Sequence, residues 1–292
     1  MKTILDAIGK TPMIEIQKIN PYPKVKILAK LEGANPAGSV KDRIAKAMIQ
    51  DAEKRGLLAP GKTIIEATSG NTGLGLAMIS SIRGYRFIAV MPASASAERK
   101  KLLRAYGAKI ILTDAKKGTN GAIKTAQKIL QKNKSYFMPD QFNNPLNPLT
   151  HYQTTGMEII RQAPDINIFV AGMGTGGTLM GVGKRLKEYN PKIKIIGVEP
   201  YAKEKISGLR NMKAYTPSIF DENKLDKKIM ARERNALKTA KLLFSKEGVS
   251  AGISSGAAMW AALKMAKEIK KGTIVVLFPD KGDKYLSTKL FK

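Results

Sequence analysis

The sequence alternates short apolar runs with amphipathic segments along most of its length. In the first half, strands are expected at 63–67, 87–91 and 109–113, and helices at 43–55, 74–82, 97–106 and 118–132. Strands that alternate with helices at this spacing pair in parallel, because each helix carries the chain back across the sheet before the next strand begins. The sequence therefore predicts an α/β protein whose mostly parallel sheets are covered by helices on both faces.

The same alternation resumes beyond a break at 139–148, a segment with three prolines and three asparagines that we interpret as a linker. Further strands are expected at 166–171, 193–198, 229–232 and 273–278, and further helices at 151–161, 179–189, 235–247 and from 252 to about 270. A length of 292 residues favours two domains over one. We therefore expect two doubly wound domains, each with three layers.

The chain has no cysteine and a single histidine, His151. These counts exclude a disulfide framework, a thiol nucleophile and a Cys/His zinc site, and they leave at most one histidine-based triad. Because His151 has no acidic residue in register, we expect it to position or cap its helix and not to catalyse a reaction. No metal site is predicted.

The composition also bears on location and partners. The first ten residues carry Asp6 within their apolar part, and no apolar run reaches the roughly 20 residues of a membrane span. A chain without cysteine fits a reducing cytoplasm, where we expect this protein to act, away from any membrane. The net charge of +28 would attract phosphates, carboxylates and nucleic acid, but the basic residues are dispersed. This dispersal favours a solvated surface over the alternative of a specific nucleic-acid site.

One lysine, Lys41, stands where its positive charge is unfavourable. The stretch 35–43 has the sequence Asn-Pro-Ala-Gly-Ser-Val-Lys-Asp-Arg, in which Ser39 is the expected N-cap of a helix and Asp42 the acid of a capping box. Lys41 would then lie at the positive end of the helix dipole, beside Arg43. Both effects favour the neutral amine, which can attack a carbonyl to form a Schiff base, although Asp42 acts in the opposite direction. A solvated surface lysine is the alternative.

Three loops that open a helix are rich in glycine and hydroxyl groups. They are Ala-Thr-Ser-Gly-Asn-Thr-Gly at 67–73, Gly-Met-Gly-Thr-Gly-Gly-Thr at 172–178 and Gly-Ile-Ser-Ser-Gly at 252–256. Backbone N–H groups and the helix dipole favour an anion at such positions. Because open α/β sheets bind ligands beyond the carboxyl ends of their strands, we expect these loops to gather with Lys41 along that edge.

The loop at 172–178 is compatible with two kinds of ligand. It satisfies the GxGxxG pattern, and Glu199 ends the next expected strand, so a dinucleotide-binding oxidoreductase is one interpretation. A lysine, an anion cradle and a separate phosphate cradle together favour an aldehyde cofactor that carries a phosphate. Pyridoxal 5'-phosphate fits this description, with Lys41 as its Schiff base.

Four motifs occur in the order and spacing of the cysteine synthases, and two more are similar to the ends of that family. These motifs lie at 35–43, 66–73, 174–178, 252–256, 8–12 and 285–288. Over nearly its whole length the chain resembles these fold-type-II pyridoxal-phosphate enzymes, whose fold is like that of the tryptophan synthase β-subunit. The resemblance implies a smaller mobile domain at 35–142, a larger domain made of 1–34 and 143–292, and a homodimer.

The resemblance also implies an activity and roles for individual residues. The reaction would be a β-replacement that forms L-cysteine from O-acetylserine or O-phosphoserine and a sulfur donor through an aminoacrylate intermediate. Lys41 would bind the cofactor and later take the substrate α-proton. The other cofactor contacts would be Asn71, Gly174, Thr175, Gly176, Gly177, Thr178 and Ser254. The substrate carboxylate would be bound by Thr68, Ser69, Thr72 and Gln141.

The subgroup is indicated by the segment Gly-Leu-Arg-Asn-Met at 208–212, which is similar to the B type of cysteine synthase and to members that use O-phosphoserine. Arg210 is therefore the candidate residue for binding a substrate phosphate, with a solvated loop arginine as the alternative. Cystathionine β-synthase-like activity and desulfuration of cysteine are alternative reactions on the same fold. A serine acetyltransferase partner is not indicated.

Overall fold

The computed structural model describes residues 3–68 and 70–292 and divides them into two compact units. Unit 1 comprises the described residues up to Ile8 together with Asn35–Leu146, and unit 2 comprises Gly9–Ala34 and Asn147–Lys292. The predicted division put the start of the chain and residues 143–146 into the larger domain. Local contacts explain the difference. Leu5 is buried in the core of unit 1, where its carbonyl accepts a hydrogen bond from Lys46 Nζ at 2.8 Å, and Asn144 Nδ2 donates to the Pro139 carbonyl at 2.8 Å.

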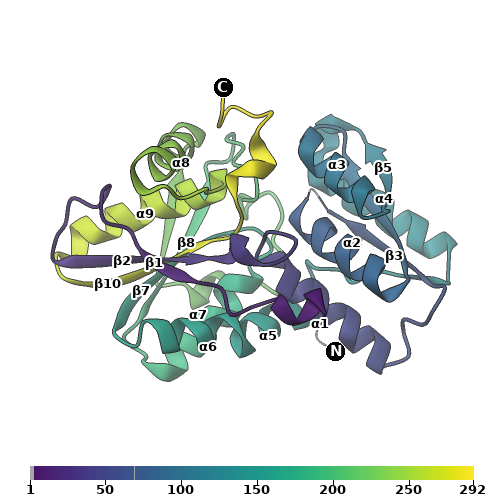
Figure 1. Ribbon diagram of the computed structural model, residues 1–292, viewed down its shortest axis with the longest axis horizontal. Helices are drawn as coiled ribbons and strands as arrows, with labels where there is room; N and C mark the ends of the chain where they lie inside the picture. Colours follow the sequence, from purple (N-terminus) through teal and green to yellow (C-terminus); the bar gives the residue numbers. More distant parts are fainter. Residues whose placement is uncertain (1–2, 69) are drawn as a thin grey trace. The chain divides into compact units, whose positions relative to one another are not determined.

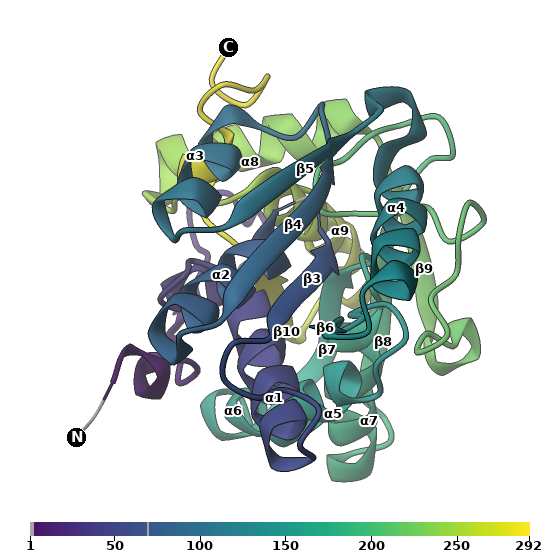
Figure 2. The ribbon, with the colours of Figure 1, turned by 90° about the vertical axis from the view of Figure 1, so that its right-hand side faces the viewer.

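Unit 1 is built on a parallel sheet with the strand order β5–β4–β3–β6. Its elements are α1 (Lys41–Lys54), β3 (Thr63–Ala67), α2 (Asn71–Arg83), β4 (Arg86–Pro92), α3 (Ala97–Ala105), β5 (Lys109–Thr113), α4 (Gly118–Lys132) and β6 (Tyr136–Phe137). Helix α4 covers the face of the sheet opposite to α2 (Figure 2). Ile64 packs with α1 and α2, whereas its neighbour Ile65 packs with Ala122 and Ala126 of α4. Both faces of the strands are therefore buried, as the apolar runs predict.

Unit 2 is built on a larger sheet with the strand order β1–β2–β10–β7–β8–β9, in which β1 is antiparallel to β2 and the other pairs are parallel. Its elements are β1 (Met13–Glu15), β2 (Val25–Leu31), α5 (Leu146–Gln153), α6 (Thr155–Gln162), β7 (Ile166–Gly172), α7 (Gly177–Tyr189), β8 (Lys194–Pro200), β9 (Lys227–Ala231), α8 (Glu233–Glu247), α9 (Ile253–Ile269) and β10 (Gly272–Phe278). Helices α8 and α9 lie on one face of this sheet, and α5, α6 and α7 lie on the other (Figure 1). No helix in the described part of the chain is long and apolar enough to cross a membrane.

The segment expected to be a linker contains the start of a helix. Helix α5 begins at Leu146, whose N–H donates to the side-chain carbonyl of Asn144 at 3.0 Å. Proline is tolerated in the first turn of a helix, where its missing N–H has no intrahelical acceptor, so Pro148 does not prevent the helix. The single helix predicted at 151–161 is therefore wrong, because the structure has two helices, with Thr154 between them.

The strand order of each sheet reverses once. In unit 1 the chain runs outward from β3 through β4 to β5, and α4 then returns it to β6 on the other side of β3. In unit 2 it runs from β7 through β8 to β9, and β10 then pairs on the other side of β7. Open α/β sheets bind ligands beyond the carboxyl ends of the strands at such switch points. The loops that follow β3 and β6, and those that follow β7 and β10, thus occupy the places where this fold binds ligands.

A fully buried lysine joins the first strands of unit 2 to helix α6. Lys30 on β2 has no exposed surface. Its Nζ donates to the carbonyl of Thr11 at 2.7 Å, to Glu158 Oε2 at 2.7 Å and to Gln162 Oε1 at 2.8 Å. A buried ammonium is tolerated only when charge and hydrogen bonds compensate for lost hydration, and here all three of its protons are used.

Replacing Lys30 by methionine should lower the free energy of unfolding by about 3 kcal/mol, because the change removes three hydrogen bonds to a charged group and the ion partner of Glu158. Urea unfolding followed by circular dichroism measures the loss. Lys26→Met is the matched control, since Lys26 lies on the same strand but is exposed, and it should change the value by less than about 0.5 kcal/mol. Equal effects of the two substitutions would contradict the role given to Lys30.

Candidate functional site

Lys41 is the first residue of α1 and is half-buried. Its backbone N–H donates to Ser39 Oγ at 3.2 Å. The carboxylate of Asp42 accepts the N–H of Ala37 at 2.6 Å and the hydroxyl of Ser39 at 3.3 Å. The predicted capping box is wrong in this detail, because Val40 takes the N-cap position and Asp42 folds back over the turn that precedes the helix. These hydrogen bonds hold the turn before the helix in one conformation and so fix the backbone position of Lys41.

Three of the predicted substrate-carboxylate residues, Thr68, Thr72 and Gln141, make hydrogen bonds at the switch point of unit 1. Thr68 Oγ1 accepts the N–H groups of Gly70 at 3.2 Å and Gly73 at 3.0 Å, which closes the loop between β3 and α2. The hydroxyl of Thr72 donates to Gln141 Oε1 at 2.5 Å, and Gln141 Nε2 donates to the Ala67 carbonyl at 3.2 Å. Gln141, which follows β6, is thereby joined to the loop that follows β3.

Two further predicted residues belong to this loop. Asn71 is the first residue of α2 and is half-buried. Ser69 lies outside the described residues, so its predicted role stays a prediction. The first N–H groups of α2 have no acceptor within the helix, and this end of the helix therefore favours a carboxylate.

Close packing brings the start of α1 against the start of α2. A Cβ atom added to Gly75 would lie 3.1 Å from Ala45 Cβ and 3.3 Å from Asp42 Cα. A side chain at this position would require Ala45 or the backbone of Asp42 to shift by a few tenths of an ångström, so glycine favours the close approach of the two helices. Lys41, the neighbour of Asp42, and the loop that opens α2 thus belong to two adjacent helix N-termini of unit 1.

A buried carboxyl group lies behind the carboxylate loop. The two oxygens of Glu66, at the end of β3, accept the N–H groups of Asp140 at 2.9 Å and Gln141 at 3.4 Å. Asp140 has a left-handed backbone with φ of 52°, which is uncommon for a residue with a side chain. Burial, together with the charge of Asp140, raises the pKa of Glu66 to about 8, although the two N–H groups act in the opposite direction. The sequence analysis included Glu66 in the motif at 66–73 but assigned it no role, and the structure shows that it anchors the backbone of Gln141.

In unit 2, the loop Gly172–Thr178 joins β7 to α7. Gly176 has a φ of +85°, a conformation that favours glycine, and the side chains of Thr175 and Thr178 are buried. The first N–H groups of α7 have no acceptor within the helix. Together with the two hydroxyls they form a cradle whose donors fit a phosphate.

Two other predicted residues of unit 2 lie against this cradle. The N–H of Arg210 donates to the Met173 carbonyl at 2.8 Å, and a Cβ atom added to Gly174 would lie 2.9 Å from the Gly208 carbonyl oxygen. A Cβ atom added to Gly208 would in turn lie 3.3 Å from Ser254 Oγ, at the buried start of α9. The segment at 208–210 therefore bridges the phosphate cradle and Ser254.

The side chain of Arg210 is not that of a solvated loop arginine. Its guanidinium stacks on the ring of Tyr215, with 4.7 Å between the guanidinium carbon and the ring centroid. Burial lowers the pKa of Arg210 below its ordinary value, while Tyr215 acts in the opposite direction. A stacked, partly desolvated guanidinium is well suited to bind an anion.

The dinucleotide interpretation gains no support from Glu199. This residue is buried, and its carboxylate accepts the N–H of Met212 at 2.9 Å and pairs with Lys228 at 3.2 Å. Glu199 thus fastens the segment beyond β8 to β9, and these bonds occupy the carboxylate that would bind a ribose. Within the described ranges, no group of three or more His, Cys, Asp or Glu side chains is placed to hold a metal ion.

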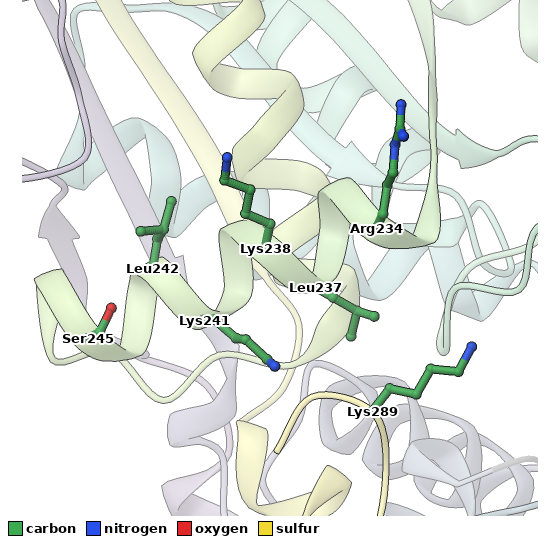
Figure 3. A pocket seen from close by; sticks show the side chains of 7 residues that line it. All are labelled: Arg234, Leu237, Lys238, Lys241, Leu242, Ser245 and Lys289. Atoms are coloured by element: carbon green, nitrogen blue, oxygen red, sulfur yellow. The ribbon is translucent and has the colours of Figure 1, made fainter. Parts of the chain in front are cut away.

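A shallow pocket on helix α8 lies apart from the predicted site residues (Figure 3). It is lined by Arg234, Leu237, Lys238, Lys241, Leu242, Ser245 and Lys289. Lys289 pairs with Glu233 at 2.9 Å, and the cationic side chains are exposed. None of the predicted cofactor or substrate residues lines this pocket, which fits the dispersed positive surface that the composition indicates.

Comparison with known proteins identifies the family. The family model described as pyridoxal-phosphate dependent enzyme matches residues 4–280. A cysteine synthase of Aquifex aeolicus is 48% identical over 99% of this chain and 92% of its own length. The chain belongs to the cysteine synthase family of pyridoxal-phosphate dependent enzymes. Another member, cysteine synthase B of Salmonella typhimurium, is 43% identical over 100% of this chain and 96% of its own.

Solved structures support the same family. The crystal structure of an O-ureido-L-serine synthase matches with a TM-score of 0.95 and 39% identity, over 100% of this chain and 95% of that one. The α/β fold, the cysteine synthase family and the cofactor predicted from the sequence are thus confirmed. The roles of individual residues stay predictions.

Replacing Glu66 by glutamine should change how stability depends on pH. Because the pKa of Glu66 is raised from 4.5 to about 8, the folded state retains a proton that the unfolded chain releases. The stability of the wild type therefore falls as the pH rises through this window and levels off above it, whereas glutamine does not titrate. Relative to Glu66→Gln, the wild type should lose a few kcal/mol of unfolding free energy between about pH 5 and about pH 9.

Urea unfolding of both proteins at about pH 5, 7 and 9 measures this difference. Asp51→Asn is the control, since Asp51 lies on α1 of the same unit, pairs with Arg55 at 3.2 Å and is partly exposed. Its curve should run parallel to that of the wild type. A difference between wild type and Glu66→Gln that stays constant across the three conditions would show that Glu66 does not titrate in this window.

Proposed function

We propose that this protein uses pyridoxal phosphate to form L-cysteine from an activated serine, O-acetylserine or O-phosphoserine, and a sulfur donor. The observation that carries the proposal is the type of group found at the two switch points. Unit 1 offers an amine and a carboxylate loop at adjacent helix N-termini, and unit 2 offers a phosphate cradle beside a buried serine. A family that depends on pyridoxal phosphate and includes cysteine synthases needs these groups.

The residues of unit 2 fit the cofactor. We assign its phosphate to Gly174, Thr175, Gly176, Gly177 and Thr178, whose N–H and hydroxyl groups are donors at a helix N-terminus. Ser254 would face the pyridine nitrogen. The cofactor, when bound, withdraws electrons from the α-carbon of the substrate, and a hydroxyl at the ring nitrogen makes it a weaker electron sink than a carboxylate would. This tuning suits elimination at the β-carbon.

The residues of unit 1 would bind and deprotonate the substrate. Thr68, Ser69, Thr72 and Gln141 would hold its α-carboxylate, with the dipole of α2 adding attraction. Asn71 would bind the ring hydroxyl of the cofactor. Lys41 would supply the amine that binds the cofactor aldehyde and, once displaced, accept the α-proton at Nζ.

We further propose that Arg210 selects O-phosphoserine. Its backbone is bonded to Met173 at the edge of the phosphate cradle, and its guanidinium is stacked and partly desolvated. Such a group gains more from a phosphate dianion than from the neutral acetyl ester of O-acetylserine. The cystathionine β-synthase-like and desulfurating alternatives gain no comparable support from the observed contacts.

The state and location of the protein are part of the proposal. A homodimer is proposed on the family resemblance, and size-exclusion chromatography with light scattering tests it. A cytoplasmic location is proposed because the chain has no cysteine. The proposed partners are small molecules, namely the amino-acid substrate and the sulfur donor.

Replacing Lys41 by alanine should abolish cysteine formation and the covalent attachment of the cofactor. Borohydride reduction followed by peptide mass spectrometry should find the cofactor on Lys41 of the wild type and on no lysine of the variant. Lys54→Ala, at the exposed end of the same helix, should behave like the wild type. Cofactor attached to a different lysine, or an active Lys41→Ala variant, would overturn the assignment.

Replacing Arg210 by alanine should raise KM for O-phosphoserine about 10- to 100-fold, the loss expected for hydrogen bonds between charged groups. KM for O-acetylserine should change less than about threefold, since that substrate lacks the phosphate. Lys213→Ala removes an exposed charge from the same segment and serves as the control. Equal loss with both substrates would show that Arg210 supports the loop and does not select the substrate.

A further inference from the structure

Two fully buried polar side chains of α5 lie behind the phosphate cradle of unit 2. Asn147 Nδ2 donates to Thr175 Oγ1 at 3.0 Å, and His151 Nε2 lies 3.3 Å from Thr178 Oγ1. Neither Asn147 nor His151 has exposed surface. Each of the two cradle hydroxyls therefore contacts a polar group on the side of α5.

Glycines in α7 fix the position of these side chains. A Cβ atom added to Gly177 would collide with the side-chain amide of Asn147. One added to Gly181 would lie 2.8 Å from His151 Cβ and would clash with the Pro148 carbonyl. No side chain of α7 separates α5 from α7 at these positions. The close contact between the two helices therefore fixes where the side chains of Asn147 and His151 lie.

The hydrogen-bond partners of His151 constrain its tautomer. Nδ1 lies 3.0 Å from the hydroxyl of Thr155, which is also fully buried. A threonine hydroxyl has one proton, so Thr178 can donate to a phosphate only if its oxygen accepts a proton from the ring. This requires the proton of the neutral imidazole on Nε2, with Nδ1 accepting from Thr155. In the opposite tautomer Thr178 would donate to Nε2 and present lone pairs to the phosphate.

Thr175 follows the same rule. Its oxygen accepts from Asn147 Nδ2 and from the N–H of Gly177 at 3.4 Å, so its own proton is left for another acceptor. Both cradle hydroxyls thus accept from behind and can donate forward.

We propose that His151, protonated on Nε2, and Asn147 are positioning residues that turn the Thr178 and Thr175 hydroxyl protons toward the phosphate of the bound cofactor. This inference rests on the proposed function and deepens it by naming the groups that orient the cradle. It assigns to the single histidine of the chain a role in holding the cofactor that acts through Thr178 and involves no contact with the substrate. Groups that orient the residues binding a ligand commonly change its affinity about 10- to 100-fold when removed, as they do at metal sites.

The tautomer can be observed without any substitution. Because His151 is the only histidine, a nitrogen-15 correlation spectrum of the labelled holoenzyme contains a single imidazole. We expect the shift of a protonated nitrogen at Nε2 and that of an unprotonated nitrogen at Nδ1. The reverse assignment, or two protonated nitrogens, would overturn the inference.

Two substitutions separate positioning from packing. Glutamine can place an amide donor near the site of Nε2, whereas asparagine is too short to reach Thr178. His151→Asn should weaken binding of pyridoxal phosphate about tenfold or more and broaden or shift the phosphorus-31 signal of the bound cofactor, while His151→Gln should stay within about threefold of the wild type. Gln153→Ala, an exposed position on the same helix, is the control.

Binding of a ligand without a phosphate tests whether the effect of His151→Asn is confined to the phosphate of the cofactor. Binding of pyridoxal, which lacks the phosphate, should be equal in wild type and His151→Asn, since the positioned hydroxyls serve the phosphate alone. Equal losses for both ligands, or equal losses in the asparagine and glutamine variants, would show a merely structural role and overturn the inference. If the wild type itself binds no pyridoxal phosphate, the proposed function fails first, so the two failures are distinguishable.

Discussion

The first turns of four helices, α1, α2, α7 and α9, are the constraint on which the rest of this structure depends. Each first turn leaves backbone N–H groups without an intrahelical acceptor. Helices α2 and α7 directly follow parallel strands, so their first turns lie at the carboxyl edge of their sheets. Unit 1 has two of them in contact through Gly75, and unit 2 has the starts of α7 and α9 bridged by the segment at 208–210. Binding a carboxylate or a phosphate there completes hydrogen bonding that the fold itself leaves open.

Two of these helix starts are supported by buried polar groups, which come from β3 and the segment after β6 in unit 1 and from α5 in unit 2. In unit 1, Glu66 fixes the backbone of Gln141, and Gln141 reaches back to Thr72. In unit 2, Asn147 and His151 contact the hydroxyls of the cradle. Buried polar groups are costly unless they are paired, so such networks persist where they determine one arrangement of a site. Because its pKa is raised, the buried carboxyl of Glu66 lowers the stability of the folded state at neutral pH.

Much of the fold could be predicted from the sequence, because buried parallel strands are continuous apolar runs and their loops carry glycine. The predicted bounds of β3 and β5 coincide with the observed ones. Strand β6 was missed because two residues, Tyr136 and Phe137, form no pattern. The first residues of α5 were assigned to a linker because Pro145 and Pro148 obscure a helix start that depends on Asn144. Local pattern has no access to a contact such as that of His151 with Thr178, which are 27 positions apart.

The candidate site, like the fold, could be predicted from the sequence only in part. Motifs rich in glycine and hydroxyl groups identify the residues that would face a ligand, because a few adjacent residues are enough to define such a motif. The residues behind them, Glu66 and Asn147, were assigned no role from the sequence, since a buried carboxyl or amide becomes informative only when its partners are known. A positioning or capping role for His151 was inferred by elimination. The structure shows that its ring contacts the hydroxyl of Thr178.

The cradle and the proposed selector for the substrate differ in how they are built. Thr175 lies between β7 and α7, Thr178 lies in the first turn of α7, and both contact side chains of α5, so a change in any of these elements disturbs the cradle. Arg210 lies in the irregular stretch between β8 and β9, which is tied down by Glu199 at its carboxyl side and by one backbone bond to Met173. Leu209 and Phe220 of this stretch pack against Gly172 and Gly176 of the cradle, whereas the guanidinium of Arg210 lies over Tyr215 within the stretch itself. The proposed roles therefore fall on different elements, with the cofactor phosphate at the start of α7 and the leaving group of the substrate at Arg210.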